Sequence, residues 1–332
     1  MATIEKRATG QYRARVRKGE VKVSETFRTK AEATAWAARI ESDLAAGKRG
    51  AAPNRTFGEL LERYIEEVIP AKRGARPDTL RLLRIARDEA LANVRLPDLG
   101  PEHFAAWRNR RLLEVSPNSV RREWGSLSHA CSIAVREWRW LPENPMSRVE
   151  KPAQTAARTR RVHPDDIERL LLATGYQHEV PNPTQMARVG AAMLFAIETA
   201  MRAGEICGLT WEHVDFSRRL AHLPMTKNGH PRDVPLSKEA IRILKQQEQI
   251  KIAEEPVFQI KAASLDALFR KAKARALIDD LHFHDTRREA LTRLAARVDV
   301  MTLAKISGHR DLRILQNTYY APDMGQVAAL LD

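Results

Sequence analysis

The residues of this chain that are best suited to chemistry lie in its C-terminal half. They are two arginines, a lysine, two histidines and two adjacent tyrosines: Arg202, Lys227, His284, Arg287, His309, Tyr319 and Tyr320. A guanidinium group matches the geometry of a phosphate, and histidine exchanges protons near neutral pH. A tyrosine hydroxyl can act as a nucleophile. Together, these residue types could bind a phosphate ester and break it without a metal ion.

Each of these residues also has an ordinary structural interpretation when it is considered alone. Arg202 and Glu205 are three residues apart on an expected helix and could form a surface ion pair. Lys227 falls in an expected turn, where lysine is usually solvated, and Gly308-His309 could simply end a helix. The two tyrosines could be packing aromatics.

The order of the motifs is more informative than any single residue. Thr199-Ala200-Met201-Arg202 is followed along the chain by Thr226-Lys227-Asn228-Gly229, His284-Asp285-Thr286-Arg287, Ser307-Gly308-His309 and Asn317-Thr318-Tyr319. This succession resembles the catalytic domain of the tyrosine recombinase (phage integrase) family. The motifs of that family are Arg, Lys, His-x-x-Arg, Gly-His and a C-terminal Tyr, in that order. The resemblance extends over about residues 160–325.

The resemblance implies that the positively charged residues act on a DNA phosphodiester. Arg202 and Arg287 would bind the non-bridging oxygens of the phosphate, and Glu205 would orient Arg202. Lys227, on its hairpin, would protonate the leaving 5′-oxygen. The glycine that usually stands two residues before the first arginine is Ala200 here, a change that we expect the fold to tolerate.

The resemblance also implies roles for the histidines and for a tyrosine. His284 would accept the proton of the nucleophile, and His309 would form a hydrogen bond with a phosphate oxygen. Many members place the nucleophile nine residues after the second histidine, where this chain has Thr318. Members that end in Asn-Thr-Tyr place it ten residues on, which selects Tyr319. Tyr320 remains an alternative because Tyr320-Ala321 is similar to the ending of other members.

Sequence patterns divide the chain into three expected domains. Residues 1–50 predict a small β-sheet with one helix, residues 55–150 an all-helical domain, and residues 160–332 helices with a β-hairpin near 221–236. We therefore expect a multidomain α+β protein, mainly helical with small β-sheets. The layout is similar to that of integrases of mobile elements, in which a sheet domain binds arm sites and a helical domain binds core sites.

Hydrophobic periodicity and turn residues place the individual elements. Strands are expected within residues 11–27, and Thr29/Glu32 and Thr56/Glu59 form capping boxes that begin helices. Further helices are expected at about 77–92, 101–114, 118–140, 184–203, 238–250, 264–276, 285–297, 300–306 and 311–317.

Three arginines in the first domain form a candidate DNA-binding face. The segment Tyr12–Arg17 alternates strictly, so that Arg13, Arg15 and Arg17 share one face of a strand and Tyr12, Ala14 and Val16 the other. A twisted sheet can enter the major groove of DNA, although such a face could also be merely solvated.

Composition supports a polyanionic partner. The chain has 56 Lys and Arg against 42 Asp and Glu, a net charge of +14 that is spread over all three expected domains. It has no apolar run long enough to span a membrane, and its polar start excludes a secretory signal peptide. Two cysteines are too few for a disulfide framework or a cysteine zinc site. We expect a cytoplasmic protein, associated with the nucleoid when it is bound to DNA.

The sequence thus predicts a site-specific recombinase that integrates or excises a mobile element through a 3′-phosphotyrosyl intermediate, with no cofactor and no metal. Its expected partner is double-stranded DNA with core and arm attachment sites, on which four protomers assemble. DNA-bending or directionality proteins could assist it. The apolar tail 327–331 could pack on a neighbouring protomer or on its own domain.

Three other functions compete with this prediction. A metal-dependent nuclease could use His282, His284, Asp285 and His309 as ligands. A non-catalytic architectural protein would share the charge and the layout but would not need an intact catalytic set. A type IB topoisomerase uses similar chemistry, but the N-terminal sheet pattern favours a recombinase.

Overall fold

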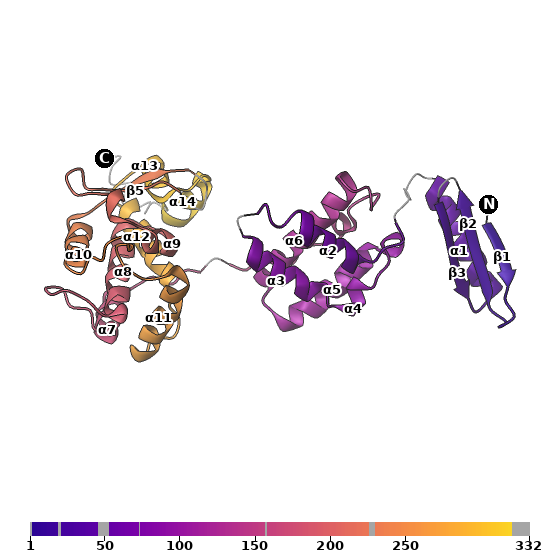
Figure 1. Cartoon of the computed structure of the whole chain (residues 1–332), viewed down its shortest axis with the longest axis horizontal. Coiled ribbons are helices and arrows are strands. Elements are labelled where there is room, and N and C mark those ends of the chain that lie inside the picture. The colour runs from indigo at the N-terminus through magenta and orange to yellow at the C-terminus, as the bar shows by residue number, and fades with distance from the viewer. Residues whose placement is uncertain are drawn as a thin grey trace, which may run out of the picture. The chain divides into compact units, whose positions relative to one another are not determined.

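The computed structural model describes residues 2–18, 21–45, 53–72, 74–156, 158–225 and 230–320. These residues form two compact units, Met1–Ala157 and Arg158–Asp332 (Figure 1). The turn with Lys227 and the tail after residue 320, for which a hairpin turn and an apolar packing segment were predicted, lie outside the described residues.

The N-terminal segment forms an antiparallel sheet of three strands in the order β1-β2-β3, with one helix packed on it. The elements are β1 (Ala2–Lys6), β2 (Tyr12–Lys18), β3 (Val21–Phe27) and α1 (Lys30–Ala45). Ala14 and Val16 are buried against Ala33 and Ala37 of α1, which leaves the arginines of β2 on the opposite face. The two strands predicted over 11–27 are confirmed, but β1 was not predicted because its side chains are mostly polar.

The rest of the first unit is helical around a separate hydrophobic core. Its helices are α2 (Phe57–Glu67), α3 (Ala75–Ile85), α4 (Glu89–Ala92), α5 (Pro101–Glu114) and α6 (Pro117–Arg136), with short 3-10 turns η1 (Leu96–Asp98) and η2 (Pro145–Arg148). The capping box of Thr56 and Glu59 begins α2 as predicted. The single helix expected over 77–92 is wrong, since Asp88 begins a second helix, α4.

The second unit is built around a nearly all-apolar helix, α8, which packs against α7, α10, α11 and α12 (Figure 1). Its helices are α7 (Pro164–Thr174), α8 (Gln185–Thr199), α9 (Ala203–Cys207), α10 (Lys238–Glu248), α11 (Ala262–Arg275), α12 (Phe283–Ala295), α13 (Val300–Ser307) and α14 (Leu312–Tyr319), with the 3-10 turn η3 (Trp211–His213). The expected helix over 184–203 ends earlier, because Ala200 adopts a left-handed conformation with φ of 54°. This conformation explains why glycine is usual at that position.

A second small sheet lies beside these helices, in the order β4-β5-β6. Its antiparallel strands are β4 (Val214–Asp215), β5 (Leu220–Leu223) and β6 (Arg232–Pro235). The two hairpin strands were predicted, whereas β4 has only two residues and gives no sequence pattern. Strand β6 contacts α13, so the sheet meets the helix that ends at Gly308-His309.

Arginines among the first residues of the second unit form ion pairs with carboxylates of the same unit. Arg158 bonds the carboxylates of Asp280 and Asp285, and Arg161 bonds both oxygens of Glu289, a carboxylate only 5% exposed. Asp285 and Glu289 belong to α12, the helix of the His-x-x-Arg motif. No helix among the described residues is long and apolar enough to cross a membrane.

Candidate active site

The motif arginine Arg202 is held by a carboxylate that a second arginine also binds. Arg202 is the N-cap of the short helix α9. Both its backbone nitrogen and its Nη1 donate hydrogen bonds to the carboxylate of Glu205, at 2.8 and 2.9 Å. Arg232 of β6 donates to both oxygens of Glu205, at 2.9 and 2.7 Å. Burial alone would raise the pKa of Glu205, but hydrogen bonds from Arg232 and Arg202 lower that pKa to about 2. Glu205 is therefore ionised at neutral pH and positions both guanidinium groups.

The second motif arginine, Arg287, is almost completely buried, at 3% exposure. It donates to the backbone carbonyls of Ala200 and Ser307, the latter at 2.6 Å, and so joins the ends of α8 and α13. Burial, followed by the charge of nearby Arg202, lowers the pKa of Arg287 to about 9, so it stays charged at pH 7. The remaining N–H groups of Arg287 can donate hydrogen bonds to an anion.

His309 lies against this positive cluster, after the left-handed Gly308 that ends α13. Its Nδ1 lies 2.7 Å from Oγ of Ser307. Burial, together with the charges of Arg287, Arg202 and Arg232, lowers the pKa of His309 to about 4. The imidazole is therefore neutral at pH 7 in the free protein.

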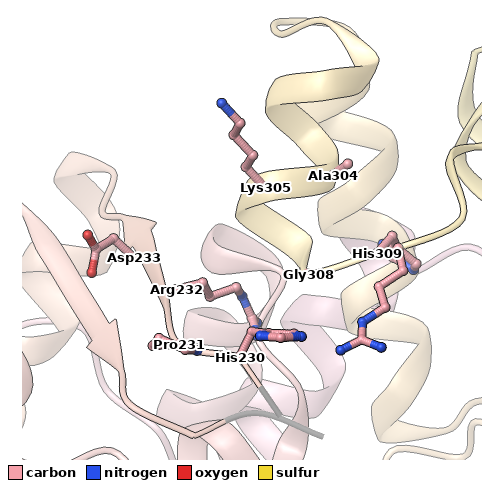
Figure 2. Close-up of a pocket in the computed structure, with 9 residues that line it drawn as sticks. His230, Pro231, Arg232, Asp233, Ala304, Lys305, Gly308 and His309 are labelled. Carbon is pink, nitrogen blue, oxygen red and sulfur yellow. The ribbon is translucent and has the colours of Figure 1, made fainter. Parts of the chain in front are cut away.

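A pocket of about 460 Å³ opens beside His309. Figure 2 shows that residues of β6 and of the segment before it face the end of α13 across this space. Arg232 extends beneath Gly308, where its Nε donates to the carbonyl of Ile306 at 2.8 Å. The pocket is lined by His230, Pro231, Arg232, Asp233, Ala304, Lys305, Gly308, His309 and Arg310.

The two candidate nucleophiles have different surroundings. Tyr319 is half-buried at the end of α14, with the guanidinium of Arg288 5.8 Å from its ring centre. Burial raises the pKa of Tyr319, although Arg288 and Arg287 act in the opposite direction. The hydroxyl of Tyr320 instead donates to the carbonyl of Val298 at 2.6 Å. The charge of the motif arginine Arg287 thus acts on Tyr319, whereas the hydroxyl of Tyr320 is bonded to a backbone carbonyl.

The remaining predicted residues are placed as follows. His284 is exposed on the first turn of α12 and lies close enough to influence the charge of His309. Lys227 lies outside the described residues.

The hypothesis of a metal-dependent nuclease gains no support, because the carboxylate of Asp285 already accepts hydrogen bonds from the backbone nitrogen of His282 and from Arg158. Within the described ranges, no group of three or more His, Cys, Asp and Glu could hold a metal ion.

In the N-terminal sheet, the three predicted arginines lie together on the face that α1 does not cover. Arg15 and Arg17 are exposed, and Arg13 is half-buried and donates to Ser24 at 3.1 Å. Arg15 lies 3.7 Å from Glu5 of β1, an exposed ion pair that leaves the face open to solvent.

Two residues of the site were not predicted from the sequence. Arg232 lies on the same face of β6 as buried Val234. An arginine at an inward-facing strand position is therefore the sequence signal that could have identified it as a site residue. Ser307 precedes the Gly-His motif, and its contact with His309 depends on how α13 ends. No sequence pattern indicates that contact.

Comparisons with known proteins show which proteins this chain is similar to. The family model described as the phage integrase family matches residues 160–326. A Haemophilus influenzae protein assigned to the integrases and recombinases is 50% identical over 98% of this chain and 89% of its own length. The shufflon-specific DNA recombinase of Escherichia coli is 35% identical over 79% of this chain and 68% of its own length.

Solved structures show the same fold. Lambda integrase as a dimer bound to a core site has a TM-score of 0.66 at 18% identity, over 97% of this chain and 95% of that one. Lambda integrase as a tetramer on a Holliday junction has a TM-score of 0.63 at 18% identity, over 93% of this chain and 95% of that one. The family match and the extent of identity with the Haemophilus influenzae protein show that the chain belongs to the phage integrase family and is a site-specific recombinase of the tyrosine type.

Proposed function

We propose that this recombinase integrates or excises a mobile element, and that Tyr319 is its nucleophile. The observation that carries the proposal is the convergence of half-buried Arg202 and His309 with buried Arg287 on one site, with Tyr319 near enough to act on the charge of Arg287. Glu205 pairs with Arg202 and Arg232, but its one negative charge does not balance those of Arg202, Arg232 and Arg287, so the site favours an anion. A phosphodiester fits the forked geometry of two guanidinium groups.

The reaction follows from the residue types. The oxygen of Tyr319 attacks phosphorus and the bond from phosphorus to the 5′-oxygen breaks, which leaves a 3′-phosphotyrosyl bond and a free 5′-hydroxyl. The tyrosine proton passes to His284, and Lys227 gives its proton to the leaving oxygen. Arg202 and Arg287 stabilise the charge that develops on the phosphate oxygens. Attack by a 5′-hydroxyl from another strand reverses these steps and completes the exchange.

We assign the three expected domains to separate DNA contacts. The separate hydrophobic cores of the sheet segment and of the helical segment support a division of the first unit near residues 50–55. The open arginine face of the sheet suits arm sites, and the helical domain together with the catalytic domain suits core sites. Since its substrate is DNA, we place the enzyme at the nucleoid.

We also propose that four protomers act together, because exchange between two duplexes requires four strand cleavages. The fold shared with lambda integrase, which forms a tetramer on a Holliday junction, supports this assembly. Accessory DNA-bending or directionality proteins remain part of the proposal.

A nicked suicide duplex that carries the element's attachment site tests the proposed function. We expect the protein to become attached to a DNA 3′ end through Tyr319 in the presence of EDTA. Tight binding without any adduct would instead favour the architectural protein. Relaxation of supercoiled DNA without strand exchange would favour a topoisomerase.

A further inference from the structure

Ser307 makes two short contacts that together determine the position of a proton. The side chain is fully buried in the last turn of α13. Its Oγ lies 2.6 Å from the carbonyl oxygen of Leu303 and 2.7 Å from Nδ1 of His309. Both distances are typical of hydrogen bonds to a hydroxyl.

A serine hydroxyl has only one proton to donate. The carbonyl oxygen of Leu303 can only accept, so the proton of Ser307 must lie on that contact. Oγ of Ser307 therefore accepts from His309, and the donor is the N–H at Nδ1 of the imidazole. Because a neutral imidazole has one N–H, Nε2 of His309 then has a lone pair.

The charges around the ring keep it neutral before a ligand binds. The groups that face His309 come from α9, α12, β6, α13, α14 and the loops beside the pocket. Those that act on His309 or line its pocket are Arg202, His230, Arg232, Asp233, His284, Arg287, Lys305 and Arg310, and Glu205 and Tyr319 act on the adjacent Arg287. Two of the nearest acidic groups are already paired, Glu205 with arginines and Asp233 with His222. The surroundings of His309 are therefore strongly positive.

We propose that Ser307 is a positioning residue that holds the proton of His309 on Nδ1, so that His309 donates to a DNA phosphate oxygen only after it takes up a second proton. This inference rests on the proposed function, in which His309 meets the scissile phosphate. A lone pair on Nε2 would repel a phosphate oxygen. The negative charge of the bound phosphate offsets the arginines and stabilises the imidazolium, so one proton from water enters with each occupied site.

The position of the proton can be observed without DNA. In the full-length protein labelled with ¹⁵N-histidine, long-range nitrogen–proton NMR distinguishes the two neutral forms, and Ser307→Ala, His309→Gln and wild type identify the signal. We expect the Nδ1–H form of His309 in wild type and a shift towards the Nε2–H form in Ser307→Ala. Ser307→Thr, which retains the hydroxyl, should resemble wild type. An Nε2–H form in wild type would overturn the inference.

Proton uptake on DNA binding is the second measurement. Calorimetry of attachment-site DNA in two buffers of different ionisation enthalpy gives the number of protons taken up. We expect Ser307→Ala to take up about one proton fewer per bound protomer than wild type, since neutral His309 can then donate from Nε2. Equal uptake by the two proteins would also contradict the inference.

His284→Ala is the control for the other histidine near the site. In the His284→Ala background, proteins with and without Ser307→Ala should still differ by about one proton taken up per bound protomer. Failure of the proposed function is distinguishable, because wild-type protein would then form no covalent adduct while the NMR result on His309 would be unaffected.

Discussion

Arg232 binds both oxygens of the Glu205 carboxylate, and the side chains of this pair are 8% and 7% exposed. The same guanidinium reaches the carbonyl of Ile306 through Nε. One side chain thus joins β6, α9 and the end of α13, and it supports Arg202 and His309 without belonging to either motif.

Removing Arg232 should therefore cost both stability and catalysis. In Arg232→Met, Glu205 loses its strongest partner while it stays buried, and we expect the free energy of unfolding to fall by about 3 kcal/mol. Urea unfolding measures this loss. Arg313→Met is the matched control, because Arg313 is 82% exposed and its ion pair with Asp311 lies at the surface, so this substitution should leave the free energy of unfolding nearly unchanged. Similar losses in both variants would contradict the role of Arg232.

The low pKa of Glu205 predicts a specific dependence of stability on pH. The folded protein lowers this pKa to about 2, so the ionised carboxylate stabilises the fold above about pH 4.5. That contribution is lost as the pH falls towards 2, and we estimate about 3 kcal/mol for it. Unfolding free energies of wild type and Glu205→Gln should therefore converge between pH 4.5 and 2. Parallel curves over this range would show that Glu205 does not titrate as described.

Substitution of Tyr319 and of Tyr320 should have different effects in a DNA cleavage assay. Tyr319→Phe should form no covalent adduct with a nicked suicide substrate and should still bind the DNA. Tyr320→Phe should keep cleavage but lose about 1 kcal/mol of stability, because the bond to the carbonyl of Val298 is removed. An adduct with the Tyr319 variant would assign the nucleophile to Tyr320.

The arginine face of the N-terminal sheet should contribute to DNA binding through phosphates. The combined change of Arg13, Arg15 and Arg17 to Gln should weaken arm-site binding and lower the salt dependence, the slope of log K against log salt, by about 2 to 3. Cleavage of a short core-site duplex should be unchanged. Arg39→Gln is the control, because Arg39 is exposed on α1. An equal loss at core sites would argue against a separate arm-binding face.

Much of this organisation could be predicted because it depends on local patterns. The alternation in β2, the capping box at Thr56 and the long apolar run of α8 each reflect short-range geometry that can be read directly from the sequence. The motif order placed Arg202, Arg287 and His309 in one site although 107 residues separate the first from the last.

The parts that were missed depend on contacts between distant segments. Arg232 is important because β6 passes over the end of α13 and beside α9, which no local pattern encodes. The expected helix is split near Asp88, whose backbone is extended between α3 and α4 and whose carboxylate accepts hydrogen bonds from Arg110 of α5. The early end of α8 depends on a left-handed Ala200, a conformation that an alanine rarely adopts.

The arginines at the start of the second unit determine where this unit can be separated from the rest of the chain. A fragment that begins at residue 162 would lack Arg158 and Arg161. The carboxylates of Asp285 and Glu289, which are each 5% exposed on the helix of the His-x-x-Arg motif, would then lose these counter-ions. A fragment that begins at or before Arg158 retains them. A protease cut just after Arg161 should therefore inactivate the enzyme without touching its catalytic side chains.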